Sequence, residues 1–495
     1  MEDPPFPDLC NLNQDLPSNQ TDIVIIGSGI AAAAVARSIL IESKRVGRLR
    51  RVVVLESRDL CSGASGRNVG HLKSMPHELF DRLRTDIGIS RARAITRFQL
   101  NQIKVLTELC DVEALYAAEC REVQAVDFYF TEDDRDEAFE KIRRLQRAIP
   151  ELTVRMWDED QVQTLFGVND TVKGAVSYIA GAMSPYRFVC SVWDHLRRKH
   201  KYFLYIKTGT SVLAVQTIQG GDYAYNVVTT AGNIKCNHVV HATNAHATQF
   251  IPGLRGKMTG LVGTICAQRP GRRFPDLNGM RSWSLVHGHT YDYATQRPTI
   301  DGRQGDIIAG GGFAVCEGRG ISTLGRWDDD QVDPIPVAHL RGIFPVIFDP
   351  LYGSPSRAVL SRPSWSAVTA ITGDLLPFVG RLDPSLTGRM PDLQNNRAVR
   401  RGERPSEYVS AGYADDGMTW AWFAGTAIGV MIVGTEKEEV RRELGYLEGR
   451  LDRWFPPELE PTPDRIAKAS LKNLSTRFFW SLLAHRVSWN SFRNR

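Results

Sequence analysis

The N-terminal part of the sequence contains a glycine-rich turn of the kind that binds the phosphates of a dinucleotide. It reads Gly27-Ser28-Gly29-Ile30-Ala31-Ala32, or GxGxxA. The first glycine permits a tight turn, and the second lets the backbone approach a pyrophosphate. The small third residue lets a helix pack closely against a strand. The N-terminus of that helix offers unpaired N–H groups and a partial positive charge to an anion. We therefore expect all six residues to contact a cofactor.

Glu56 is an acid at the position where such a site binds ribose. It lies 24 residues beyond Ala32 and directly follows the apolar run Val52–Leu55. A carboxylate there accepts hydrogen bonds from ribose hydroxyls. It also repels a 2′-phosphate, which argues against NADP.

The elements around this turn form one strand–helix–strand unit. The unbroken apolar runs Ile23–Ile26 and Val52–Leu55 are typical of strands buried on both faces, and the small residues from Ile30 to Ala36 favour a helix between them. Together they predict a doubly wound parallel sheet. Further strands are expected near 202–206, 225–229 and 239–242, a helical stretch from about 79 to 146, and an exposed loop or insertion over 383–405.

A second loop of small residues indicates whether the dinucleotide is FAD or NAD. After Glu56 the chain continues Ser57-Arg58 and then Ser62-Gly63-Ala64-Ser65-Gly66-Arg67-Asn68-x-Gly70-His71. Small residues let backbone N–H groups crowd against a second phosphate and a planar ring, which an NAD enzyme does not need here. The loop favours FAD, although a flexible glycine-serine turn is the alternative.

These motifs resemble the FAD-dependent oxidoreductases of the D-amino acid oxidase/glycine oxidase (DAO) type. The likeness continues at Val240–Ala245, Thr372–Gly380 and Gly412–Thr419, so it covers most of the chain. It is greatest for the branch with gamma-glutamylputrescine oxidase-like and fungal FAD-oxidoreductase proteins. The resemblance implies FAD, with further contacts from Val212, Thr243, Asn244, Gly412, Gly417, Met418 and Thr419. Relatives can attach the flavin through a cysteine or histidine, but residues 365–374 contain no cysteine and His71 is a lone histidine in its loop, so we expect noncovalent binding.

The same resemblance implies two interleaved domains. A Rossmann-like FAD-binding domain, with a doubly wound parallel sheet, would comprise residues 1–80, 181–255 and 365–440. An α+β substrate domain built on an antiparallel sheet would comprise residues 81–180 and 256–364, and 441–495 would form a helical tail. A helix is expected to begin near Thr419 and direct its N-terminus at the flavin.

The implied reaction is oxidation of a C–N bond of an amine or amino acid. A hydride would pass to flavin N5, leaving an imine, and oxygen would reoxidise the flavin to give hydrogen peroxide. The flavin carries this chemistry, so no catalytic side chain is assigned. Tyr293, Arg297 and Arg362 are substrate-side candidates, since an arginine can pair with a carboxylate.

One motif departs from the family pattern. The family usually has glycine and then histidine or glutamate before Gly417, whereas this chain has Asp415-Asp416. Two inward carboxylates would oppose a reduced-flavin anion, so we expect at least one to face solvent or to cap the following helix. This departure keeps open a catalytically silent FAD-binding assembly or scaffold protein. An NAD-dependent dehydrogenase is the third alternative, and an acceptor other than oxygen stays open.

Composition excludes other classes. The 495 residues carry a net charge of +5 from 61 basic and 56 acidic residues, too small an excess to indicate nucleic-acid binding. The longest apolar run, Ala421–Gly434, is too short to span a membrane. The eight cysteines are scattered without a CxxC motif, so we expect no metal site and a reduced, cytoplasmic protein.

Overall fold

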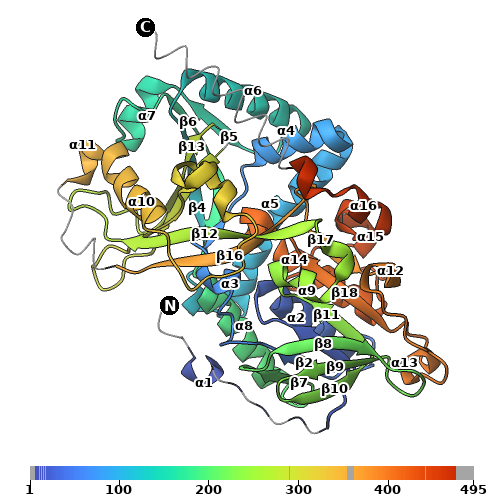
Figure 1. Ribbon diagram of the computed structural model, residues 1–495. Coiled ribbons are helices and arrows are strands. Elements are labelled where there is room, and N and C mark those ends of the chain that lie inside the picture. The colour runs from blue at the N-terminus through green and yellow to red at the C-terminus, as the bar shows by residue number, and fades with distance from the viewer. Residues whose placement is uncertain are drawn as a thin grey trace.

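The computed structural model describes residues 6–10, 12, 14, 16, 18–288, 290–353, 362–440 and 442–474. Its core is divided between two large sheets, one in the lower and one in the upper half of Figure 1. Segments distant in sequence contribute strands to each sheet, and the division into interleaved domains stays a prediction. Both the Rossmann-like sheet and the second, mainly antiparallel sheet are confirmed.

The lower sheet has six strands in the order β17-β18-β11-β1-β2-β7. Its members are β1 (Ile23–Ile26), β2 (Val52–Leu55), β7 (Leu204–Lys207), β11 (His238–His241), β17 (Phe378–Arg381) and β18 (Ser406–Ala411). All neighbours pair in parallel except β17, which runs antiparallel to β18. The first two strands are fully buried, as their apolar sequences predict.

Two helices pack closely on one side of this sheet. They are α2 (Ile30–Arg45), which follows the glycine-rich turn, and α14 (Ala421–Val433). A Cβ at Gly425 would lie 2.5 Å from the Ala31 carbonyl oxygen, and one at Gly429 would lie 2.3 Å from the Ser38 Cβ. Only glycine at these two positions permits this approach. Helix α8 (Pro185–Lys199) also contacts α2.

The upper sheet has nine strands, eight of them in the order β16-β12-β15-β14-β13-β4-β6-β3, with β5 pairing to β6. Its members are β3 (His71–Leu72), β4 (Arg121–Tyr129), β5 (Val154–Trp157), β6 (Gly174–Ala182), β12 (Met258–Gln268), β13 (Arg281–His287), β14 (Thr290–Gln296), β15 (Ile307–Gly311) and β16 (Ser364–Thr372). All pairs are antiparallel except β13 with β4. The helices around it are α4 (Pro76–Ile87), α5 (Ile89–Val112), α6 (Glu132–Ala148), α7 (Glu159–Phe166), α10 (Pro334–Ile347) and α11 (Asp349–Tyr352).

A small three-stranded antiparallel sheet lies beside β2 and β7 of the Rossmann-like sheet, in the lower part of Figure 1. Its strands are β8 (Val212–Thr217), β9 (Tyr225–Thr229) and β10 (Gly232–Cys236). Short helical turns complete the fold: α1 (Pro7–Cys10), α3 (Ala64–Arg67), α9 (Ala247–Phe250), α12 (Pro384–Thr387), α13 (Arg397–Arg400), α15 (Leu451–Trp454) and α16 (Pro463–Lys468).

The structure corrects two local predictions. The stretch expected to be helical from 79 to 146 contains strand β4, whose β-branched and aromatic residues fill the centre of the upper sheet. Residues 383–405 are not simply an exposed loop, because Asn396 is fully buried and donates a hydrogen bond to Asn237 at 3.0 Å. The C-terminal tail from residue 475 onward lies outside the described residues. Among those described, no helix is long and apolar enough to cross a membrane.

Candidate functional site

A cavity of about 590 Å³ lies between the two large sheets. Strands β1 and β2 and helix α2 contribute to its floor, and β12, β14 and β16 contribute from the upper sheet. Of the predicted cofactor residues, those that line it are Gly27, Ser28, Gly29, Ile30, Ala31, Glu56, Ser57, Arg58, Gly63, Ala64, Ser65, Asn68, His71, Val212, Thr243, Asn244, Gly417 and Met418. The cavity therefore brings together segments from residue 27 to residue 418.

The glycine-rich turn is held in a conformation that only glycine adopts easily. Gly27 has φ of +104°, and a Cβ there would lie 2.6 Å from the Ala242 carbonyl oxygen. Its N–H donates to the Leu55 carbonyl at 2.8 Å, which ties the turn to β2. The turn is thus fixed against two neighbouring strands at the edge of the cavity.

Glu56 is oriented by the turn that it follows. The Ser28 hydroxyl donates to Glu56 Oε2 at 2.6 Å, and the Cys61 N–H donates to Ser28 Oγ at 2.8 Å. Glu56 Oε1 accepts the Arg58 N–H at 3.0 Å. These bonds hold the carboxylate on the cavity wall, where it can accept ribose hydroxyls.

The two helix starts in the cavity suit the diphosphate of FAD. Helix α2 begins after Gly29 and α3 after Gly63, and neither has a side-chain cap or an acid in its first turn. The Ser65 hydroxyl accepts the Ile30 N–H at 3.0 Å, so the second loop packs over the start of α2. In addition, Thr243 Oγ1 is buried without a hydrogen-bond partner on the cavity wall. The residues present therefore fit FAD, and the N–H groups at the start of α2 would hold its phosphates.

The remaining predicted cofactor residues lie behind the cavity wall. They are Ala32, Ser62, Gly66, Arg67, Gly70, Gly412 and Thr419, which do not line the cavity. Arg67 donates to the carbonyl oxygens of Ser62, Asp329 and Ser366, so it clamps the loop to β16. A Cβ at Gly66 would lie 2.1 Å from the Cys61 carbonyl oxygen, and one at Gly70 would lie 1.9 Å from that of Met183. These glycines allow close packing of the loop.

Two tyrosines and a buried lysine form the other end of the cavity. Tyr291 and Tyr293 lie on β14 with their ring centroids 5.7 Å apart, and both line the cavity. Lys73 contacts Asp127 through its ammonium group and donates to the Ser284 hydroxyl at 2.7 Å. The Tyr178 hydroxyl donates to Asp127 at 2.9 Å. Burial lowers the pKa of Lys73, and the nearby Asp127 charge partly offsets that effect.

Asp415 and Asp416 both line the cavity instead of capping a helix. Within the described residues neither carboxylate makes an ion pair. Desolvation by the enclosing walls of the cavity raises the pKa of Asp415 to about 6. The same desolvation and the Asp415 charge raise the pKa of Asp416 to about 7, while Arg82 and Lys73 act in the opposite direction. Asp415 is exposed and Asp416 partly exposed, so it is the enclosing walls of the cavity, and not a dry core, that disfavour their charge.

The structure places one of the three predicted substrate-side residues in the cavity and two outside it. Tyr293 lines the cavity, whereas the two arginines lie elsewhere. Arg297 makes two hydrogen bonds to Glu119, at 2.6 and 2.7 Å, and Arg362 pairs with Asp306 at 3.1 Å. Among the described residues, Arg58 is the arginine that lines the cavity, and its partner is Asp329.

Sequence reasoning did not assign Lys73 or Ser284 to the site, and of the two tyrosines on β14 it named only Tyr293 as a substrate-side candidate. Lys73 lies two residues after His71, and residues two apart in an extended segment share a face. That spacing is the signal that could have identified it. Tyr291 has the same relation to Tyr293. Ser284 carries no comparable sequence signal, since its place depends on the pairing of β13 with β4.

Comparisons with known proteins agree with this geometry. A family model described as FAD dependent oxidoreductase matches residues 22–469. No curated protein matches the chain in sequence. Among solved structures, glycine oxidase from Bacillus cereus ATCC 14579 has a TM-score of 0.60 at 14% identity, covering 86% of this chain and 96% of that one.

Two further solved structures share the fold. L-proline dehydrogenase from P. horikoshii has a TM-score of 0.59 at 16% identity, covering 89% of this chain and 98% of that one. L-alpha-glycerophosphate oxidase from Mycoplasma pneumoniae, with FAD bound, has a TM-score of 0.56 at 15% identity, covering 86% and 98%. At these identities the likeness shows the fold alone, and the family match is what identifies the cofactor.

Proposed function

Because the chain belongs to the FAD-dependent oxidoreductase family, we propose that it oxidises a C–N bond of an amine held in this cavity beside noncovalently bound FAD. The observation that supports this is one cavity that runs from the glycine-rich turn and Glu56 to Tyr291, Tyr293 and the two acids. When bound, FAD supplies the two-electron acceptor, and oxygen is the proposed final acceptor, giving an imine and hydrogen peroxide.

The charges at the tyrosine end favour an amine over an amino acid. A substrate carboxylate needs an unneutralised cation, but Lys73 is paired with Asp127 and the two candidate arginines are paired outside the cavity. Asp415 and Asp416 instead offer carboxylates that attract an ammonium group. The faces of Tyr291 and Tyr293 add aromatic surface of the kind that binds cations.

Asp416 can also hold the proton that the substrate must lose. Hydride leaves the carbon beside a neutral amine, so an ammonium substrate must first transfer a proton to the protein. A carboxylate with a pKa near 7 is suited to accept it at neutral pH. In this proposal Asp416 binds the cation first and then holds its proton, while the tyrosines exclude water.

The test is anaerobic reduction of the purified flavoprotein. We expect alkyl mono- or diamines to bleach the flavin absorbance, and amino acids to do so poorly. Asp416→Asn should slow bleaching at least tenfold, whereas Asp136→Asn, on the exposed side of α6, should not. A flavin that no amine or amino acid reduces would overturn the proposal and favour the silent scaffold. Colour that stays with acid-precipitated protein would overturn noncovalent binding.

A further inference from the structure

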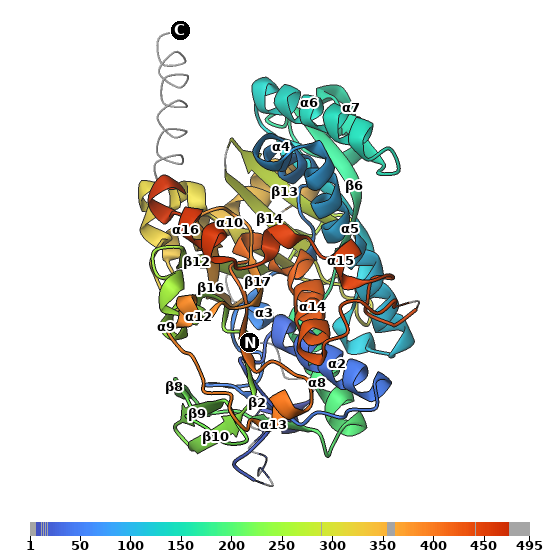
Figure 2. The ribbon, with the colours of Figure 1, turned by 90° about the vertical axis from the view of Figure 1, so that its right-hand side faces the viewer.

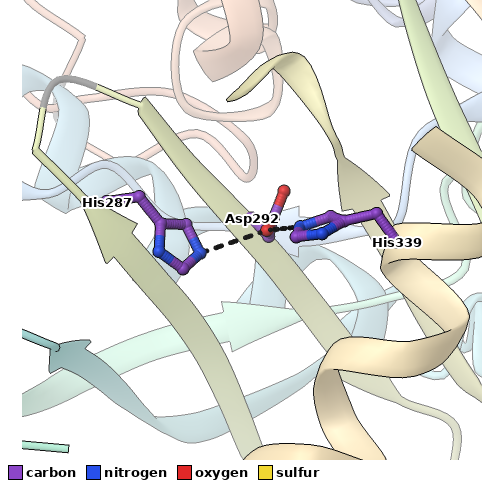
Figure 3. A group of neighbouring side chains, drawn as sticks. All are labelled: His287, Asp292 and His339. Atoms are coloured by element: carbon purple, nitrogen blue, oxygen red, sulfur yellow. Dashed lines mark hydrogen bonds and ion pairs between the residues drawn. The ribbon is translucent and has the colours of Figure 1, made fainter. Parts of the chain in front are cut away.

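A histidine–aspartate–histidine cluster lies on the far side of strand β14 from the cavity. Asp292 lies between Tyr291 and Tyr293, and alternate residues of a strand point to opposite faces. His287 comes from the end of β13, and His339 comes from α10, which packs on the sheet through β12 and β15. Figure 3 shows both imidazole rings directed at the Asp292 carboxylate.

The three side chains converge on one oxygen atom. His339 Nε2 lies 2.6 Å from Asp292 Oδ2, and His287 Nε2 lies 3.3 Å from the same oxygen. The two nitrogens and the oxygen all lie within 4.8 Å of one another. Around a tetrahedral ion with bonds of about 2.0–2.1 Å, two ligand atoms are about 3.3 Å apart. The cluster therefore needs only small shifts to surround a metal ion.

The surroundings hold two of the three ligands, Asp292 and His287, in place. The Gly312 N–H donates to Asp292 Oδ1 at 2.6 Å, which leaves Oδ2 directed at the histidines. The His287 ring stacks on Phe130 with centroids 4.9 Å apart and planes 11° apart. Hydrogen-bonded carboxylates and fixed imidazole rings are what a metal site requires around its ligands.

One nitrogen in the cluster is left unsatisfied by protein groups alone. His287 Nε2 is buried and has no hydrogen-bond partner among the described residues, although Asp292 Oδ2 lies 3.3 Å away. His339 already occupies that oxygen with a good hydrogen bond. In the described structure no hydrogen bond satisfies the His287 nitrogen. A metal ion between the three atoms would satisfy it.

We propose that His287, Asp292 and His339 bind one divalent transition-metal ion, with a water molecule as a fourth ligand. Two imidazole nitrogens and one carboxylate oxygen, with water as the fourth ligand, are a donor set that Zn²⁺ binds, so Zn²⁺ is the probe for this site. The ion joins the β13–β14 hairpin to α10 behind Tyr291 and Tyr293, so its role is to position the cavity wall. The sequence predicted no metal site because the ligands lie at 287, 292 and 339, outside any short motif.

The test measures zinc itself on the FAD-loaded full chain. After dialysis against a chelator, zinc chloride is added and binding is followed by calorimetry and by metal analysis of desalted protein. We expect one zinc per chain, X-ray absorption that reports two imidazoles among nitrogen and oxygen ligands, and a higher melting temperature with zinc. These readouts are independent of any amine substrate, so their failure leaves the proposed oxidation untouched.

Variants separate a built site from adventitious binding. Asp292→Asn and His339→Gln should each weaken zinc binding at least tenfold and abolish the zinc-dependent rise in melting temperature. His195→Gln, a partly exposed histidine on α8, is the matched control and should bind zinc as the parent does. Should either ligand variant lose its FAD spectrum, His287→Gln at the strand end replaces it. Zinc binding that is absent, or that survives all three ligand changes as an adventitious ion only, overturns the proposal.

Discussion

Gly27→Ala is the most direct perturbation of the cofactor site, because its effect can be calculated from the turn itself. The Gly27 φ of +104° lies outside the regions that residues with a Cβ adopt, at a cost of about 1–3 kcal/mol. The new Cβ would lie 2.6 Å from the Ala242 carbonyl oxygen, which must move by about 0.8 Å to reach an ordinary contact of 3.4 Å. That carbonyl cannot move freely, since the Ala242 N–H is bonded to Ile26 of β1 at 3.0 Å.

The turn therefore has to shift away from the phosphate position. Losing one backbone hydrogen bond to a charged group costs about 1.5–3 kcal/mol, which is roughly a 10- to 150-fold loss of affinity. We expect Gly27→Ala to raise the Kd for FAD by about 10- to 100-fold. The assay is fluorescence titration of apoprotein with FAD, together with the flavin-to-protein absorbance ratio after gel filtration.

A matched control separates local strain from the clash. Gly47 also has a positive φ, of +68°, but nothing lies within 4 Å of the position of its Cβ. It follows the C-terminal end of α2, away from the cavity. Gly47→Ala should lower stability by about 1 kcal/mol and leave the Kd for FAD unchanged. A Gly27→Ala protein that binds FAD within twofold of the parent would refute this reasoning.

Three further predictions follow from the cavity. Glu56→Gln should raise the Kd for FAD by about 5- to 30-fold through weaker ribose hydrogen bonds, measured in the same titration; an unchanged Kd would remove Glu56 from the site. The pKa of Asp416 is raised to about 7, so the ionised form that binds a cation disappears as the pH falls. We therefore expect kcat/KM for an amine to fall about tenfold per pH unit below 7. If Asp416→Asn left this pH profile unchanged, the proposed role of Asp416 would be contradicted. Lys73→Met leaves the Asp127 charge buried and unpaired, so urea denaturation should show a free energy of unfolding lower by about 3–5 kcal/mol. Adding Asp127→Asn should restore part of this loss. Equal losses in the single and the double variant would mean that the pair does not act as a unit.

The cofactor end of the site could be predicted from the sequence because its signals are local. Gly27, Gly29 and Glu56 belong to one strand–helix–strand unit, so their spacing alone places them at one sheet edge. The second loop is similarly contiguous, and its small residues from Ser62 to Gly66 lie beside the start of α2. The resemblance supplied the distant segments, including Thr243 and Gly417.

The substrate end could not be predicted in the same way, because it depends on pairing between distant strands. Arg297 was a reasonable candidate by residue type, yet Glu119 lies close enough to neutralise it only in the folded chain. Lys73 lacks a motif of its own, and its role becomes visible only when Asp127 and Ser284 are brought to it by the upper sheet. The sequence did not predict strand β4 because helical segments precede and follow it in the chain, so its short pattern of alternating polar and apolar residues is read as part of a helical stretch.

The strand order of the Rossmann-like sheet has a consequence for the time at which the cofactor site becomes complete. Strand β1 pairs with β11, β11 pairs with β18, and α2 is braced by α14 near the end of the chain. A ribosome that has synthesised only 400 residues has therefore made the phosphate turn but not the strand and helix that close the sheet behind it. Long-range parallel pairing of this kind forms late and slowly. Flavin capture should consequently follow synthesis of residues up to about 433, and the unfinished sheet is the species that chaperones have to shield.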